Sequence, residues 1–530
     1  MMDLAIQNFR GIRAVNPVVD VNGRGIISAV TCRNVELHYS ENGDNVGIFT
    51  AKGNLIVATC PHKVVGQWES VQNRVSYHFV FAVDDTQGYL YLYKPDSDSW
   101  EVLKDGLSVT ETCNGLTMAV GFEDWFVFTN GVDDYLGVCM AKELESERVK
   151  FLEANDDDGT PIRGLCLQTY DGRLVTNSKN RVHWSVQQNI FDWKTATDPN
   201  ILTGGAYQEF DRDVTAMVYY NNMLIVFTED YSTYFSGNPG NASSFVRGGA
   251  TGGGCSGFKA VVKFDNKIFY YDPAAQNIFA YYLIDTGQTR PTNGLADNVI
   301  EFFAGIDSNR SEQMEIVPYI SGDRSELWFK LPYLDGDKIL IYDYLKSEWI
   351  ERQQQQYVKG LSVIGGYLYS AAGNDILREY MTSEFAGTFI PAEYKMNIIN
   401  VGSDSNLKVP KMPLILTLDF DYENDFYMEF IYDDRPERAK TKRIVKFSKD
   451  YLIWADDAED KDGGFWATDE ADENGGIWLS EDKNNVMFNL AGLLNFKQLQ
   501  IRIYTAESGQ EFGIKRIELK RVKLKTKTIG

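Results

Sequence analysis

The chain has 530 residues, a formal net charge of −23, 44% hydrophobic residues and 13% aromatic residues. This length allows two or three domains with sizeable cores. The acidic balance excludes tight nucleic-acid binding by the whole surface, because such binding neutralises phosphates with Lys and Arg. An acidic wall past which DNA slides, or solubility alone, both agree with the charge.

The cysteines and the N-terminus predict folding in a reducing compartment. No two of the six cysteines lie closer than 26 residues apart, so there is no C-x-x-C framework. This pattern in a large chain favours reduced, buried thiols. The first residues show no basic segment followed by an apolar one, and no apolar run approaches the roughly 18 residues that span a membrane. We therefore expect a protein that folds in a cytoplasm.

In chain order, residues 1–40 are predicted to form an extended lead-in, punctuated by Asn16-Pro17 and by two glycines. Residues 41–390 then repeat a strand, a tight turn and a second strand. Successive turns lie 35 to 57 residues apart. They are centred on Gly53, Gly88, Asp124, Gly172, Asn221, Asn266, Asp323 and Gly366.

This spacing is the size of one four-stranded propeller blade, roughly 40–50 residues. A single blade cannot bury its own apolar face, so the units must stack around an axis. We therefore predict an all-β protein whose main domain is a β-propeller of about seven blades; six and eight also agree with the spacing.

Residues 391–530 are predicted to form a C-terminal β-sandwich, because the repeat stops near Tyr380 and prolines cluster after it. Two charge blocks lie in this domain. Residues 456–482 hold eleven acidic residues and one lysine, which is typical of a solvated insertion. Residues 515–527 hold seven Lys or Arg. They are either the exposed side of an edge strand, where Lys discourages aggregation, or a surface that docks on an acidic neighbour.

No motif in the chain predicts bond chemistry. The four histidines show no metal-ligand spacing. Cys60-Pro61-His62 is better explained as a buried thiol beside a turn. The Gly-rich stretch after Arg247 lacks the G-K-[ST] ending of a phosphate loop. We therefore predict no catalytic residue, no cofactor, no metal and no enzymatic activity.

Several phrases of the chain resemble one family. They are AIQNFRGI near the start, LQTYDGRLVTNSKNRVHWSVQQNIFDW, DVTAMVYYNNMLIVFTEDYSTYFSGNP, GGGCSGFKAVVKFDNKIFYYDPAAQNIFAYY and the C-terminal IKRIELKRVKLK. In this order they resemble the tail nozzle, or tail stabilisation, proteins of short-tailed bacteriophages. Within the second phrase, Trp184 and Trp193 are expected to fill gaps between blades, and Arg181 to donate to backbone carbonyls.

The resemblance implies a structural virion protein, assembled in the host cytoplasm and located in the tail. It would form a cyclic homo-oligomer, a hexamer, below the portal and adaptor, bind tail fibres or spikes, and pass genomic DNA without tight binding. A receptor- or carbohydrate-binding propeller of a tail spike, which could also hydrolyse glycans, is the alternative. The residues expected to dock one subunit on its neighbour are Lys515, Arg516, Lys520, Arg521 and Lys523.

Overall fold

The structure is a computed structural model of the chain. It describes residues 2–13, 24–39, 46–195, 202–239, 245–283, 289–291, 294–322, 324–354, 358–399, 407–409, 414–418, 426–444, 453–455, 465–467, 475–476, 485–488 and 498–525. The chain divides into two compact units. Unit 1 contains residues 1–53, 348–353 and 383–530, and unit 2 contains residues 54–347 and 354–382.

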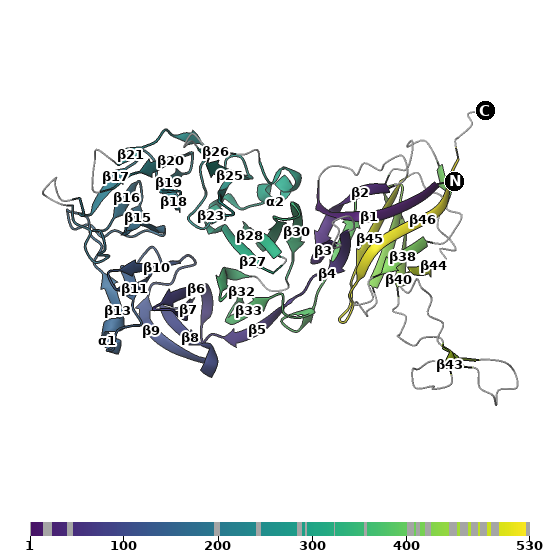
Figure 1. Ribbon diagram of the computed structural model, residues 1–530, viewed down its shortest axis with the longest axis horizontal. Helices are drawn as coiled ribbons and strands as arrows, with labels where there is room; N and C mark the ends of the chain where they lie inside the picture. Colours follow the sequence, from purple (N-terminus) through teal and green to yellow (C-terminus); the bar gives the residue numbers. More distant parts are fainter. Residues whose placement is uncertain are drawn as a thin grey trace. The chain divides into compact units, whose positions relative to one another are not determined.

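Unit 2 is a β-propeller: its described residues form seven antiparallel sheets around a common centre (Figure 1). Four blades follow one another in the first part of the unit. Their strands are β6 (Lys63–Gln72), β7 (Val75–Val83), β8 (Gly88–Lys94) and β9 (Ser99–Leu107); β10 (Asn114–Val120), β11 (Glu123–Thr129), β12 (Tyr135–Val138) and β13 (Val149–Leu152); β14 (Leu167–Tyr170), β15 (Arg173–Ser178), β16 (Arg181–Trp184) and β17 (Ala206–Glu209); β18 (Val214–Tyr220), β19 (Met223–Thr228), β20 (Tyr231–Ser236), β21 (Val246–Arg247) and β22 (Thr251–Gly252).

The remaining three blades complete the ring. Their strands are β23 (Val261–Phe264), β24 (Lys267–Asp272), β25 (Asn277–Leu283) and β26 (Thr289–Pro291); β27 (Glu315–Ser321), β28 (Arg324–Tyr333) and β29 (Gly336–Asp343); and β31 (Lys359–Ile364), β32 (Tyr367–Ala372), β33 (Asp375–Glu379) and β5 (Asn54–Thr59). The described helices are short, with three to six residues each: η1 (Pro95–Ser97), α1 (Glu145–Arg148), η2 (Asp297–Val299), α2 (Ile300–Ala304) and η3 (Ser308–Gln313).

The turn residues explain why the hairpins form where the sequence predicts them. Asn221 and Asn222 both adopt left-handed backbone conformations, with φ of 47° and 60°, between β18 and β19. Two consecutive positive φ values define the type I′ turn, whose twist matches that of the flanking strands. Asp171 and Gly172 do the same between β14 and β15, with φ of 50° and 68°. Asp323 lies outside the described residues.

The ring closes through its innermost strands and through one shared blade. The first strands of the blades, β6, β10, β14, β18, β23, β27 and β31, touch in this order, and β31 also touches β6. The last blade combines β31, β32 and β33 with β5 from the start of the unit, paired from Asp375 opposite Thr59 to Glu379 opposite Asn54. The first and last parts of the propeller are therefore held together by one antiparallel sheet.

Unit 1 is built from strands that come from both ends of the chain and from one segment between two blades. They are β1 (Met2–Ile12), β2 (Arg24–Arg33), β3 (Val35–Tyr39), β4 (Val46–Thr50), β30 (Glu348–Arg352), β34 (Glu384–Phe385), β35 (Thr388–Phe389), β36 (Glu393–Met396), β37 (Leu407–Val409), β38 (Leu414–Leu418), β39 (Phe426–Tyr432), β40 (Arg435–Ile444), β41 (Ile453–Ala455), β42 (Phe465–Ala467), β43 (Gly475–Gly476), β44 (Asn485–Phe488), β45 (Leu499–Tyr504) and β46 (Gly513–Lys525).

These strands form the second β domain. One run of paired strands is β40-β39-β45-β36-β2, and another is β44-β38-β46-β1. Their apolar side chains share a core, in which Phe426 and Phe512 lie 6.0 Å apart and Phe9 meets Tyr394 edge to face at 5.6 Å. The all-β prediction, a propeller of about seven blades with a C-terminal sandwich, is thereby confirmed.

The division of the chain differs from the predicted boundaries at 40 and 390. Residues 1–40 are not a lead-in to the propeller, because β1 pairs with β46 and β2 pairs with β36, both in the C-terminal part of the chain. The turn predicted at Gly53 is not a blade hairpin either: β4 pairs with β3 and β46, whereas β5 pairs with β33. Gly53 is instead the last residue before the chain enters unit 2.

The C-terminal strand is also not at an edge, one of its two predicted roles. β46 pairs on one side with β1 and β4 and on the other with β37 and β38. Most of the acidic insertion at 456–482 lies outside the described residues. The strands β42 and β43 within it pair with β41 in a separate three-stranded sheet.

Candidate functional site

The phrase that contains Arg181, Trp184 and Trp193 forms the first three strands of the blade of β14–β17. The Trp193 indole is buried between this blade and that of β10–β13; it donates from Nε1 to the carbonyl of Ile190 at 3.0 Å and stacks on Tyr135. Trp184 is buried on the other side of the blade, against the sheet of β18–β22. Both indoles therefore fill the spaces between blades.

Arg181 has a different role from the expected one. Its guanidinium lies 3.0 Å from a carboxylate oxygen of Asp156 and stacks over the ring of Tyr207. The same carboxylate lies 3.4 Å from Nδ1 of His183, whose pKa is lowered by burial. The carbonyl contacts are instead made by the buried Arg173, which donates to Ser185, Leu202, Thr203 and Gly204.

The five predicted docking residues all lie on β46. Lys515 is exposed and Arg516 is half-buried. Arg516 lies opposite Thr417 and Lys523 opposite Val409 in the strand register. The side chains of Lys520, Arg521 and Lys523 lie outside the described part of the structure, so only their positions on the strand are known.

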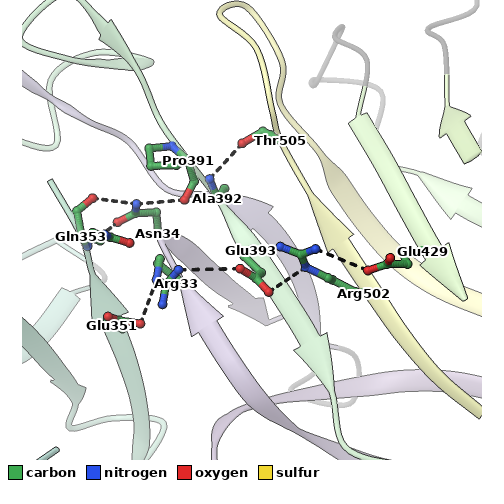
Figure 2. A network of polar contacts seen from close by, with 10 residues as sticks. All are labelled: Arg33, Asn34, Glu351, Gln353, Pro391, Ala392, Glu393, Glu429, Arg502 and Thr505. Atoms are coloured by element: carbon green, nitrogen blue, oxygen red, sulfur yellow. Dashed lines mark hydrogen bonds and ion pairs between the residues drawn. The ribbon is translucent and has the colours of Figure 1, made fainter. Parts of the chain in front are cut away.

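A row of five charged side chains crosses unit 1, and sequence reasoning missed it (Figure 2). The row runs over five adjacent strands in the order Glu351, Arg33, Glu393, Arg502 and Glu429. Arg33 Nε lies 2.9 Å from Glu351 and its Nη1 lies 3.7 Å from Glu393. Arg502 Nε lies 2.8 Å from Glu393 and its Nη1 lies 3.3 Å from Glu429. We call these residues the charged row.

Strand register explains how the charged row assembles. Arg33 lies directly opposite Glu351 in the parallel pair β2–β30, and opposite Glu393 in the antiparallel pair β2–β36. Glu429 lies directly opposite Arg502 in the pair β39–β45. Burial opposes the charge of Arg502, but hydrogen bonds to Glu393 and Glu429 outweigh it and raise the Arg502 pKa. Opposite charges at such positions stabilise neighbouring strands.

Next to the charged row, Asn34 joins the same chain segments through its side-chain amide (Figure 2). Its Nδ2 donates to the carbonyls of Gln353 and Pro391, and its Oδ1 accepts from the amide of Gln353 at 2.9 Å. The left-handed φ of 51° at Asn34 is tolerated by Asn better than by most residues. Thr505 completes the network by accepting from the amide of Ala392 at 2.9 Å.

The buried Glu348 is a second link between the segments. Its side chain is fully buried and accepts from Arg10 at 3.2 Å, from Arg13 at 2.7 Å and from the amide of Gly11 at 2.9 Å. No sequence signal could have revealed this contact or the charged row, because the partners lie at least 73 residues apart and form no motif. These contacts hold the strands of unit 1 together, and none of them places a nucleophile beside a base.

The cysteines and His62, whose side chains could take part in catalysis or metal binding, make structural contacts. All six cysteines are buried, as the sequence predicts, and burial raises the pKa of Cys60 to about 11. His62 stacks on Tyr89, and its Nδ1 lies 2.6 Å from the hydroxyl of Tyr91. In the described ranges, no three His, Cys, Asp or Glu side chains gather as a metal site would require. No helix there is long and apolar enough to cross a membrane.

Comparisons with known proteins find similarity in structure only. No protein-family model matches the chain, and no curated protein sequence matches it. Similar solved structures include BamB from Moraxella catarrhalis, with 9% identity and a TM-score of 0.34 over 71% of this chain and 97% of that one. They also include a catalytically inactive virginiamycin B lyase from Staphylococcus aureus with quinupristin, with 11% identity and a TM-score of 0.39 over 62% of this chain and 98% of that one. Similarity at this level carries no argument about function.

Proposed function

We propose that this protein is a structural component of a bacteriophage tail, a nozzle subunit. Six copies form a ring below the portal and adaptor; the ring continues the DNA channel, retains the genome, passes it at ejection and carries tail fibres or spikes. The protein performs no bond chemistry and acts in the virion tail, after assembly in the host cytoplasm.

One observation carries the proposal. The two phrases of the resemblance that lie at opposite ends of the chain, AIQNFRGI and IKRIELKRVKLK, are adjacent antiparallel strands. Leu4 pairs with Leu519 and Ile6 with Ile517, and both isoleucines are fully buried. Phrases separated by almost the whole chain thus belong to one structural element, as expected if they derive from one family's second domain.

The charge of the chain supports passage of DNA without binding. A net charge of −23 per subunit, repeated around a ring, gives a potential that mainly repels phosphates. Lys and Arg contacts to phosphate would add salt-dependent affinity and slow the passage. The basic strand β46 is therefore assigned to contacts between proteins, at Lys515, Arg516, Lys520, Arg521 and Lys523.

Light scattering of the purified protein tests the ring. We expect a closed oligomer of six chains whose mass falls when Lys520, Arg521 and Lys523 are changed to Glu. The fall in mass should be greater at low salt, because repulsion between the introduced glutamates and an acidic neighbour is strongest there. In the control variant, three lysines of unit 2, Lys94, Lys104 and Lys179, are changed to Glu. This variant should still form the ring.

Duplex DNA binding is measured on the same samples, and it should be negligible before and after both sets of changes. A stable monomer over the whole concentration range would refute the ring. Tight duplex binding at physiological salt that the β46 changes abolish would refute the repulsive channel.

A further inference from the structure

A cavity of about 750 Å³ opens in unit 2 beside the place where the propeller ring closes. Its wall includes Lys63 at the start of β6 and Lys359 at the start of β31, the two inner strands that meet there. The β32–β33 turn contributes Gly373, whose carbonyl accepts from the amide of Val64 at 2.9 Å. The β28–β29 turn forms another part of the wall, from Leu334 to Asp337.

Two lysines of the cavity lining lie close together. Lys63 and Lys359 share a single carboxylate, that of Glu111: Lys63 Nζ lies 3.3 Å from one oxygen, and Lys359 pairs with the other. Glu111 is half-exposed and does not line the cavity. Burial and the nearby Lys63 ammonium lower the pKa of Lys359 to about 8. An additional anion here would relieve the repulsion between the two ammonium groups.

The part of the wall formed by the β28–β29 turn and Arg310 offers acceptors, because its positive charge is already paired. Arg310 is fully engaged there, with Asp337 at 2.8 Å, the carbonyl of Tyr333 at 2.6 Å and the amide oxygen of Gln313. Asp335 also lines the cavity here, and Asp375 lines it beside Gly373, where its carboxylate accepts from Thr59 Oγ1 at 2.8 Å. Carboxylates accept hydrogen bonds from hydroxyl groups. At the rim, the side chain of Leu334 is 88% exposed, an apolar surface against which a ring face can lie.

We propose that this cavity binds an acidic sugar, whose carboxylate or phosphate pairs with Lys63 and Lys359 and whose hydroxyl groups donate to the aspartates. A polyhydroxylated anion pairs with the lysines and also donates hydrogen bonds to the aspartates. A simple anion pairs with the lysines alone, and a neutral sugar contacts the aspartates alone. The volume suits one or two sugar rings. This proposal is independent of the ring of subunits, because every residue involved belongs to one chain.

Isothermal titration calorimetry at pH 7 with four probes tests the ligand class. Glucuronate and glucose 6-phosphate distinguish a carboxylate from a phosphate source, acetate lacks the hydroxyl groups, and glucosamine has the opposite charge. We expect one of the two acidic sugars to bind at least tenfold more tightly than acetate and than glucosamine. Equal binding of acetate, stronger binding of glucosamine, or no binding of either acidic sugar up to about 10 mM overturns the proposal.

Four variants locate the site. Lys63→Met and Lys359→Met should each weaken binding of the acidic sugar about tenfold, because each removes one ammonium partner. Glu111→Gln should strengthen it several-fold, because it releases both lysines from their shared carboxylate. The matched control is Lys94→Met, since Lys94 is exposed to the same degree as Lys63 and also pairs with a glutamate, Glu101. Weakening by Lys94→Met, or no change in the other three, places binding elsewhere and overturns the assignment.

Discussion

The two units of this protein reach the same class of structure by opposite routes. In unit 2, each of the blades from β6 to β26 comes from one continuous stretch of chain, so its pairings are local. In unit 1, Met2 pairs with Val522 and Arg33 pairs with Glu351 and Glu393. Bringing such distant segments together carries a larger loop-closure entropy than closing a hairpin. Unit 1 therefore depends on long-range contacts that no single segment can replace.

Deletion of β1, residues 2–12, is the strongest test of this comparison. The deletion removes the partner of β2 and β46, together with the buried Ile6, Phe9 and Ile12. It also takes Arg10 and the amide of Gly11 away from the buried Glu348. Removing one side of a buried ion pair alone destabilises by about 3–5 kcal/mol. We expect unit 1 to unfold while the propeller persists.

Hydrogen exchange followed by mass spectrometry measures this outcome for each strand. Amides of β46 and β36 should exchange as in an unfolded chain, whereas those of β15 and β19 should keep their protection. Retained protection in β46 would show that the C-terminal strands fold without the N-terminal segment. The predicted boundary at residue 40 would then be closer to the folding behaviour than the observed division.

The same contrast explains how much of the structure the sequence predicts. The hairpins at Gly172, Asn221, Asn266 and Gly366 are found because turn residues and alternating strands are local signals. Those predicted at Gly88 and Asp124 are also found, but these two residues lie in β8 and β11, just after the turns. The sequence predicts a hairpin of β5 across Gly53, because a neighbour in sequence is the default partner. Its true partner, β33, lies more than 300 residues away and leaves no local trace.

The candidate site follows the same rule. Trp184 and Trp193 could be assigned to spaces between blades, since large apolar side chains in a repeat must be buried there. The partner of Arg181 could not, because Asp156 lies in the loop after the preceding blade. The residues of the charged row come from three distant segments, and each is a charged residue of a kind common on protein surfaces. Only the register of β2, β36 and β45 brings them into one row.

Trp193→Ala tests whether damage to the propeller remains local. The indole is 4% exposed and packs between two blades, so its removal leaves a cavity and should cost about 3–5 kcal/mol of unfolding free energy. Increased hydrogen exchange should be confined to the blades of β10–β13 and β14–β17. Phe122→Ala is the control, because Phe122 is fully exposed in the β10–β11 turn and its loss should change stability by less than about 0.5 kcal/mol. Increased exchange throughout both units would contradict the local character of the propeller.

His78 makes the stability of the propeller depend on pH. Burial lowers its pKa from 6.5 to about 4, and its Nε2 lies 3.0 Å from the amide oxygen of Gln67. Between these two pKa values the unfolded chain binds a proton that the folded chain does not, so stability falls as the pH drops from about 6.5 to about 4. The full difference amounts to about 3 kcal/mol.

Denaturant unfolding of unit 2, followed at pH values from 7 to 4, measures this effect. His78→Gln removes the titration, so its stability should decline less than that of the wild type over this range. The comparison is made as a difference between the two proteins, because His183 is also buried with a lowered pKa and contributes equally to both. Parallel pH profiles for the two proteins would show that His78 is not responsible.

The charged row offers the smallest and most specific test of unit 1. Glu393 lies 2.8 Å from Arg502 but 3.7 Å from Arg33, and all three side chains are partly exposed. Exposed ion pairs contribute about 0.2–1 kcal/mol, and a pair with hydrogen-bond geometry lies at the upper end of that range. A double-mutant cycle with Arg502→Met and Glu393→Gln should therefore give a coupling of about 1 kcal/mol, and the cycle with Arg33→Met only a few tenths. Both couplings should shrink with added salt. If the Arg33 coupling proves the larger, the row is held together by the contact with the N-terminal segment rather than by its C-terminal strands, and unit 1 would rely on its longest-range pairings even at the surface.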